Sequence, residues 1–117
     1  MNYLEQITPH IPSEDMNETI NFMVDVLGFK STRHTDFYCE LSLGCHVIGV
    51  LSSDGEPNQQ SIYLRVKDID ILWADIRDKL DTEHQQRPFN RDYGMREIHL
   101  IVPGTATLLF VGSAIQS

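Results

Sequence analysis

The side chains with the greatest potential for chemistry are histidines and a glutamate in strand-like segments. His10, Glu40, His46 and His99 offer the nitrogen and oxygen donors that divalent metals bind. Glu40 and His10 would also suit a general acid–base pair. Because almost any chain of this length offers such residues, their arrangement in the fold must decide between these roles. The sequence contains no G-x-S-x-G, P-loop or G-x-G-x-x-G motif that would indicate another chemistry.

The composition is that of one globular domain with an acidic surface. The chain has 117 residues, of which 41% are hydrophobic and 22% are charged. The net charge of −8 argues against nucleic acid and anionic membranes as partners, and favours either a cationic ligand or simply solubility. We find neither a membrane-spanning stretch nor a secretory signal, so we expect a cytoplasmic protein. We expect Cys39 and Cys45 to be small buried hydrophobic residues.

Periodicity and turn residues predict the elements that must position these side chains. Helical spacing predicts one helix that begins at Ser13 or Asp15 and ends at Gly28, and another over residues 68–80. The segment 87–92 is predicted to be a solvated loop. Strand-like runs occupy residues 7–11, 37–43, 46–51, 61–66, 96–102 and 107–111.

The chain carries one strand–helix–strands unit twice. In residues 15–27 and 68–80 the closing Leu stands 12 positions after the opening Asp, and a shift of 53 residues superimposes their apolar positions. In the closing strands, Gly44 and Gly104 each stand 7 residues before an apolar residue. The repeat predicts a single domain, 1–117, with one module at about 1–52, a linker at 53–60 and a second module at about 61–113.

The segments "EDMNETINFMVDVLGF", "LRVKDIDILWADIRDKL" and "YGMREIHLIVPG" resemble the vicinal oxygen chelate superfamily, which comprises glyoxalases, bleomycin-resistance proteins and dioxygenases. Pro9 and "YGMREI" are most similar to the bleomycin-resistance branch. The resemblance implies an α+β fold of two βαβββ modules, with curled mixed sheets around a cavity and the helices outside. It also implies a homodimer with ligands bound in crevices between subunits.

The metal enzymes of this superfamily place one ligand on each of four strands. By alignment, those positions fall at Thr8, Gly49, Ser61 and Leu109, which cannot assemble a tight metal site. We therefore expect no metal and no other cofactor. The alternative is a shifted site that uses His10 and the other donors named above.

Without a metal, the predicted cavity has apolar walls with a few polar side chains. Strand alternation places residues of four strands on its surface. In bleomycin-binding relatives a tryptophan stacks on the flat rings of the drug, and the resemblance implies that Tyr93 takes its place. It also implies that Phe37 and Tyr38 match an aromatic residue that approaches the bound drug from the other subunit. Glu40, Asp36 and Glu97 would attract positive charge, and the pair Arg96 and Glu97 would fix its hairpin. The candidate ligand-binding residues are His10, Phe37, Tyr38, Glu40, Val47, Gly49, Ser61, Tyr63, Arg65, Tyr93 and Leu109.

The function that these observations favour is metal-free binding of an aromatic, cationic small molecule by a cytoplasmic homodimer, as in antibiotic resistance by sequestration. One alternative is a metal-dependent lyase or oxidoreductase of the glyoxalase or dioxygenase type with a shifted metal site. Another is an accessory module whose surface recruits a second protein.

Overall fold

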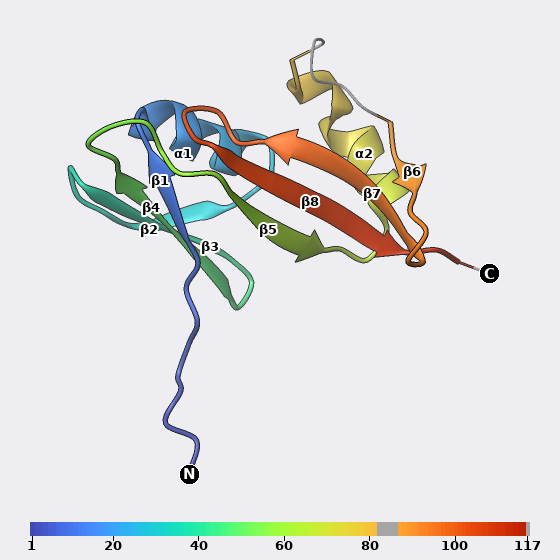
Figure 1. The fold of residues 1–117 in the computed structure, drawn as a ribbon, viewed down its shortest axis with the longest axis horizontal. Coiled ribbons are helices and arrows are strands. Elements are labelled where there is room, and N and C mark those ends of the chain that lie inside the picture. The colour runs from blue at the N-terminus through green and yellow to red at the C-terminus, as the bar shows by residue number, and fades with distance from the viewer. Residues whose placement is uncertain (82–86, 117) are drawn as a thin grey trace. The chain divides into compact units, whose positions relative to one another are not determined.

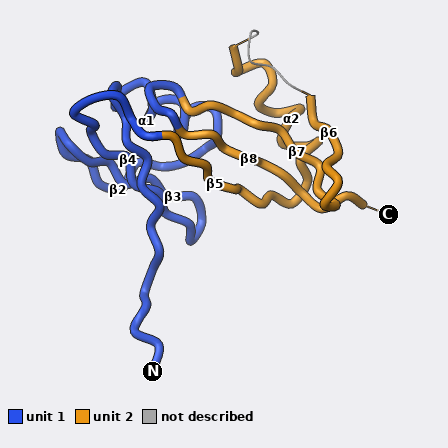
Figure 2. Tube along the Cα trace, in the orientation of Figure 1, with its two compact units in different colours: residues 1–58, 103–106 blue, residues 59–102, 107–117 orange. Residues whose placement is uncertain are grey.

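The computed structural model describes residues 1–81 and 87–116 (Figure 1). The chain forms two compact units, coloured separately in Figure 2. The first contains Met1–Asn58 and Pro103–Ala106, and the second contains Gln59–Val102 and Thr107–Ser117. Each unit holds one βαβββ module and one four-stranded mixed sheet, so the predicted α+β fold of two such modules is confirmed.

The first unit contains β1 (His10–Ser13), α1 (Met16–Asp25), β2 (Lys30–His34), β3 (Tyr38–Leu43) and β4 (His46–Ser52). Its strand order is β1-β4-β3-β2, with β1 parallel to β4 and the other pairs antiparallel. The Asp15 carboxylate accepts a hydrogen bond from the Glu18 N–H at 3.1 Å, so Asp15 and not Ser13 caps the helix. The first strand begins at His10, later than the predicted residue 7. We did not predict β2, because its five residues are all exposed and lack apolar alternation.

The turn 103–106 packs on the start of α1 in this unit. The Thr19 hydroxyl donates to the Pro103 carbonyl at 2.7 Å, and the Glu14 N–H donates to the Gly104 carbonyl at 2.9 Å. Gly104 has φ +77, and a Cβ there would lie 2.9 Å from Thr19 Oγ1 and 3.0 Å from the Asp15 carbonyl oxygen. The turn therefore requires glycine both for its backbone conformation and for the close approach.

The second unit contains β5 (Gln60–Arg65), α2 (Ile69–Ile76), a 3-10 turn (Arg77–Lys79), β6 (Phe89–Asn90), β7 (Met95–Ile101) and β8 (Thr107–Ala114). Its strand order is β5-β8-β7-β6. Asp68 caps α2, which ends at Ile76, earlier than the predicted residue 80. The segment predicted as a loop over 87–92 contains β6, because Phe89 and Asn90 pair with β7.

Each sheet buries one face against its helix. In the second unit, the Ile69 N–H at the start of α2 donates to the Ser113 hydroxyl of β8 at 3.0 Å. Cys39 is buried as predicted, whereas Cys45 is exposed because it lies in the turn between β3 and β4. Among the described residues, no helix is long and apolar enough to cross a membrane. The buried apolar side chains are Ile11, Ile20, Met23, Phe29, Cys39, Leu41, Ile48 and Val50 in the first unit, and Ile69, Ile76, Ile98, Leu100, Val102, Leu109 and Val111 in the second.

Candidate functional site

The face of the first sheet opposite α1 carries most of the residues predicted from the first module. His10 and Glu40 lie beside Gly49 on the two strands that flank β4. A Cβ at Gly49 would lie 2.6 Å from the Tyr38 hydroxyl oxygen and 2.9 Å from His10 Cδ2, so glycine lets both rings cover the strand. The two rings meet edge to face, with centroids 5.7 Å apart. Val47 lies half-buried on the same face.

The Tyr38 hydroxyl is the perturbed titratable group of this face. Burial, followed by the negative charge of Glu40, raises the pKa of Tyr38 above its ordinary value of 10.0. The phenol therefore keeps its proton at neutral pH. Phe37, in the turn before β3, is 74% exposed and leaves an aromatic ring open to solvent.

The face of the second sheet opposite α2 gathers aromatic rings around a buried carboxylate. Tyr63 stacks on Phe110 at 6.4 Å between centroids, and His99 packs on Phe110 at 4.4 Å. Phe89 meets His99 edge to face at 5.1 Å. The Glu97 side chain lies among these rings with no exposed surface.

Three donors from three segments converge on Glu97. The hydroxyls of Tyr63 and Tyr93 both donate to Oε2, at 2.8 and 2.6 Å. His99 Nε2 lies 2.9 Å from Oε1, and it carries the hydrogen because an ionised carboxylate can only accept. Gly112 permits this arrangement, since a Cβ there would overlap the Tyr63 hydroxyl and lie 2.7 Å from Glu97 Cγ.

These contacts shift the acidities of the cluster in opposite directions. Burial alone would raise the pKa of Glu97, but the hydrogen bonds from Tyr93, His99 and Tyr63 outweigh it and hold the pKa below 4.5. Burial and the bond to Glu97 raise the pKa of Tyr63 to about 12. The bond to Glu97, followed by burial, also raises the pKa of Tyr93. At neutral pH the carboxylate is ionised and accepts three hydrogen bonds, which suits a fixed binding surface better than proton transfer.

Arg91 completes the cluster. Its guanidinium carbon lies 5.5 Å from the centre of the Phe89 ring and 5.3 Å from the centre of the Tyr93 ring. Its Nη1 lies 4.0 Å from Glu97 Oε1, and 35% of its side chain is exposed. Phe89, Arg91 and Phe110 were not among the predicted site residues. Glu97 was expected only to attract positive charge and to fix its hairpin, and His99 only as a donor of the alternative metal site. The available signal was two aromatic residues and two arginines within residues 87–93, but the polar residues among them predict a loop.

The predicted orientation of Leu109 was wrong. Leu109 pairs with Ile62 and Leu100, has no exposed surface and lies in the core under α2. Phe110 occupies the opposite face, next to Tyr63. Side-chain direction alternates along a strand, so an error of one residue in register exchanges the two faces.

The other predicted residues of the second module lie on the expected face of β5. Ser61, Tyr63 and Arg65 are all exposed, and Tyr63 retains 42% of its accessible surface. Tyr93 lies in the turn between β6 and β7 and is 56% exposed. Glu97 brings Tyr63 and Tyr93 together, whereas Ser61 and Arg65 extend the surface along the strand.

The four positions expected for metal ligands do not fit a metal ion. Gly49 has no side chain, and Leu109 is in the core. In the parts of the chain that the structure describes, no group of three or more histidine, cysteine, aspartate or glutamate side chains is close enough to hold an ion. Within the first unit, His46 is exposed at the first position of β4 and alternates onto the face opposite Gly49.

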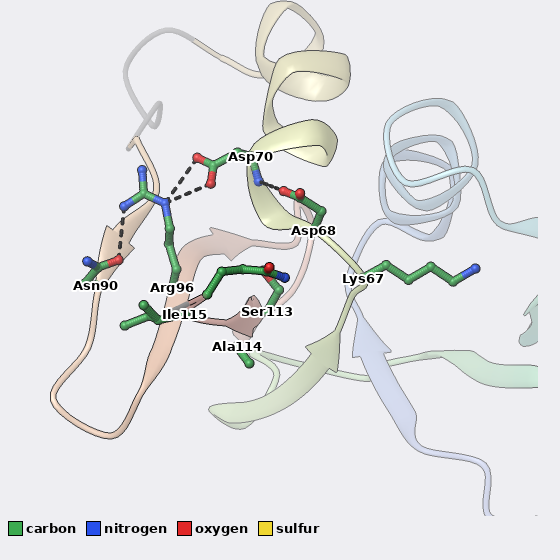
Figure 3. A pocket seen from close by; sticks show the side chains of 9 residues that line it. Lys67, Asp68, Asp70, Asn90, Arg96, Ser113, Ala114 and Ile115 are labelled. Carbon is green, nitrogen blue, oxygen red and sulfur yellow. Dashed lines mark hydrogen bonds and ion pairs between the residues drawn. The ribbon is translucent and has the colours of Figure 1, made fainter.

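A hollow of about 260 Å³ lies on the other side of the second sheet, at the start of α2 (Figure 3). Arg96 Nε donates to the Asp70 carboxylate at 3.0 and 3.1 Å, and its Nη1 donates to Asn90 at 3.1 Å. Asp68 accepts the N–H groups of Asp70 and Ile71, while Lys67 points away from the group. These contacts tie α2 to β6 and β7, so the hollow is a consequence of packing and not a second aromatic site. Arg96 was expected to fix its hairpin together with Glu97; in the structure its side chain instead binds Asp70 at the start of α2 and Asn90 of β6.

Comparison with protein families identifies the fold. A model described as the Glyoxalase/Bleomycin resistance protein/Dioxygenase superfamily matches residues 3–115. The chain belongs to this superfamily. A sequence comparison with curated proteins gives no significant match.

Solved structures of this superfamily resemble the chain at low sequence identity. A bleomycin-binding protein complexed with bleomycin has a TM-score of 0.80 at 21% identity, with 96% of this chain and 100% of that chain covered. A Streptomyces verticillus bleomycin-binding protein complexed with copper(II)-bleomycin has a TM-score of 0.81 at 17% identity, with 99% and 100% covered. A lactoylglutathione lyase from Agrobacterium tumefaciens has a TM-score of 0.75 at 13% identity, with 96% of both chains covered. Binding proteins and a lyase both resemble the chain, so the likeness establishes the fold of this superfamily member and leaves its activity to the site.

Proposed function

We propose that this protein is a metal-free binder of the bleomycin-resistance type, which sequesters an aromatic, cationic small molecule and so gives resistance to an antibiotic. The observation that carries the proposal is the open face of the second sheet, where Tyr63 and Tyr93 are anchored on buried Glu97. Aromatic walls with a few fixed polar groups are typical of small-molecule sites. Two similar structures hold bleomycin, which supports the same class of ligand here.

Two features of the protein would attract a positively charged ligand: carboxylates near the open faces of the sheets, and the net negative charge of the chain. Glu40 is half-buried beside Tyr38 on the open face of the first sheet, where it can approach a ligand. Glu97 acts through its negative charge from beneath the rings, because its side chain has no exposed surface. The net charge of −8 adds a field that favours cations.

Sequestration requires affinity for the bound molecule and no bond-making step. It is therefore compatible with four metal-ligand positions whose side chains do not suit a metal ion. The donors of the second cluster are already engaged with one another, which supports binding over conversion. The alternative of a shifted metal site requires three or more donors to meet, and this site does not bring them together.

The assembly and location are further parts of the proposal. Large apolar side chains exposed in the single chain, such as Tyr3, Ile7 and Ile71, support a homodimer that covers some of them. Sedimentation equilibrium that returned the 13.4 kDa monomer mass would exclude this assembly. The exposed free thiol of Cys45 supports a reducing, cytoplasmic compartment.

A thermal-shift screen tests the proposal. Chelator-treated protein is heated with cationic aromatic antibiotics, bleomycin among them, and with divalent metals. A ligand that binds only the folded state raises the melting temperature. We expect a cationic aromatic compound to do so without metal. A rise that appears only with a divalent metal would contradict the proposal.

Tyr93 provides the sharpest test of the site. Tyr93→Ala should weaken binding of the screened compound by about 1–3 kcal/mol, because it removes a stacking surface. Tyr93→Phe, the matched control, keeps the ring and removes the bond to Glu97, so it should lose less. Equal affinity of Tyr93→Ala and the unaltered protein would remove this ring from the site.

A further inference from the structure

Arg91 has surroundings that resemble a recognition site for a cation. Two aromatic rings, Phe89 and Tyr93, lie 5.5 and 5.3 Å from its guanidinium carbon, within the range of cation–π attraction. The Glu97 carboxylate lies 4.0 Å away and supplies negative charge. Aromatic faces together with a carboxylate are the groups that recognise guanidinium and quaternary ammonium ligands.

The walls of this site are held independently of Arg91. The Tyr93 and His99 side chains are fixed by their bonds to Glu97, at 2.6 and 2.9 Å. Phe89 is placed by the pairing of β6 with β7 and by its edge contact with His99. The turn is closed by the Arg91 N–H, which donates to the Met95 carbonyl at 2.7 Å. The walls therefore should remain when the arginine side chain leaves.

The hold on Arg91 itself is weak. Its distance of 4.0 Å to Glu97 is longer than a hydrogen bond, and 35% of the side chain is exposed. The Glu97 oxygens already accept bonds from three other groups. A long, flexible side chain held in this way can move out into solvent and give its place to another cation.

We propose that Phe89, Tyr93 and Glu97 form a cation-binding site that the chain's own Arg91 guanidinium occupies until a ligand's guanidinium or quaternary ammonium group displaces it. This rests on the proposed function, because it assigns the cationic part of the ligand to the second sheet. Arg91 therefore competes with the ligand for this site. A ligand whose cationic group binds the site less tightly than the Arg91 guanidinium does not displace it.

The experiment uses Arg91→Ala and guanidinium chloride as the probe. At about 20 mM, guanidinium should raise the melting temperature of the variant by roughly 2–5 °C relative to the same concentration of sodium chloride. The unaltered protein should rise by less than about 1 °C, since its site is filled. Arg91→Met, which keeps the apolar stem, replaces Arg91→Ala if the latter does not fold.

Two variants control for unspecific effects of guanidinium. Arg91→Ala combined with Tyr93→Ala should lose the response, because one aromatic wall is gone. Arg77→Ala removes an arginine that is 57% exposed and pairs with Asp78 at 3.7 Å, and it should respond as the unaltered protein does. An equal response of either control and Arg91→Ala, or no response of Arg91→Ala and Arg91→Met, would overturn the inference. The probe is not the antibiotic, so a response to guanidinium combined with no binding in the antibiotic screen would refute the proposed function alone.

Discussion

The buried Glu97 carboxylate is stabilised mainly by two tyrosine hydroxyls and the imidazole of His99. Hydrogen bonds to a charged group contribute about 1.5–3 kcal/mol each, which is enough to offset the burial of one carboxylate when several are present. The same bonds orient the rings of Tyr63 and Tyr93. One residue thus connects the stability of the second sheet with the shape of its open face.

Glu97→Gln should lower the free energy of unfolding by about 1–3 kcal/mol at pH 7, because the amide is a weaker acceptor for three donors. The pKa of Glu97 is lowered in the folded state, so its stabilisation is present above about pH 4.5 and is lost as the pH falls further, through the folded-state pKa. The difference between the variant and the unaltered protein should therefore shrink in acid.

Thermal unfolding between pH 7 and pH ~3 measures this difference. Glu56→Gln, at an exposed position between β4 and β5, is the matched control and should change little at any pH. Parallel pH profiles for Glu97→Gln and the unaltered protein would show that the network does not depend on the ionised carboxylate.

At the scale of elements, the sequence predicted both helices and their N-terminal caps, but it did not predict which face of the last strand is buried. Asp15 and Asp68 each precede a helical stripe, and both cap as expected. In β8, the residues from Leu108 to Val111 are all apolar, so alternation could not reveal which face is buried. Aligning Gly44 with Gly104 places the last strands of the two modules 60 residues apart. In the structure, His10 pairs with Gly49 and its counterpart Tyr63 pairs with Phe110, so the equivalent positions Gly49 and Phe110 are 61 residues apart.

The short edge strands could not be predicted from the sequence either. β6 has two residues, and β2 is polar and exposed along its length. Both are specified by pairing with a neighbouring strand and not by a pattern of their own. The aromatic cluster was missed for this reason, since β6 carries Phe89 and leads directly to Arg91.

The turn between β7 and β8 yields a prediction at this scale. Gly104→Ala should lower the free energy of unfolding by about 1–3 kcal/mol, because φ is positive and the added methyl would meet Thr19 and Asp15. Urea denaturation measures the loss. Gly55→Ala is the matched control, since a Cβ there meets nothing within 4 Å and its φ is ordinary. Equal losses for the two variants would contradict this role of Gly104.

For the whole molecule, the duplicated module was the signal that identified the fold. Two copies of one pattern determine the architecture even when identity to similar structures is 21% or less. The site could be predicted only in part, because it depends on which side chains meet across strands. Tyr63 and Tyr93 were predicted as separate contacts, and their common anchor on Glu97 became visible only in three dimensions.

The proposed function requires the protein to bind a ligand without metal and to release it unchanged. An equilibrium titration of chelator-treated protein with the compound found by screening, followed by mass spectrometry of the recovered compound, tests this directly. We predict saturable binding in the absence of metal and recovery of the compound at its original mass. Binding that requires an added divalent metal, or recovery of a compound with altered mass, would contradict the account.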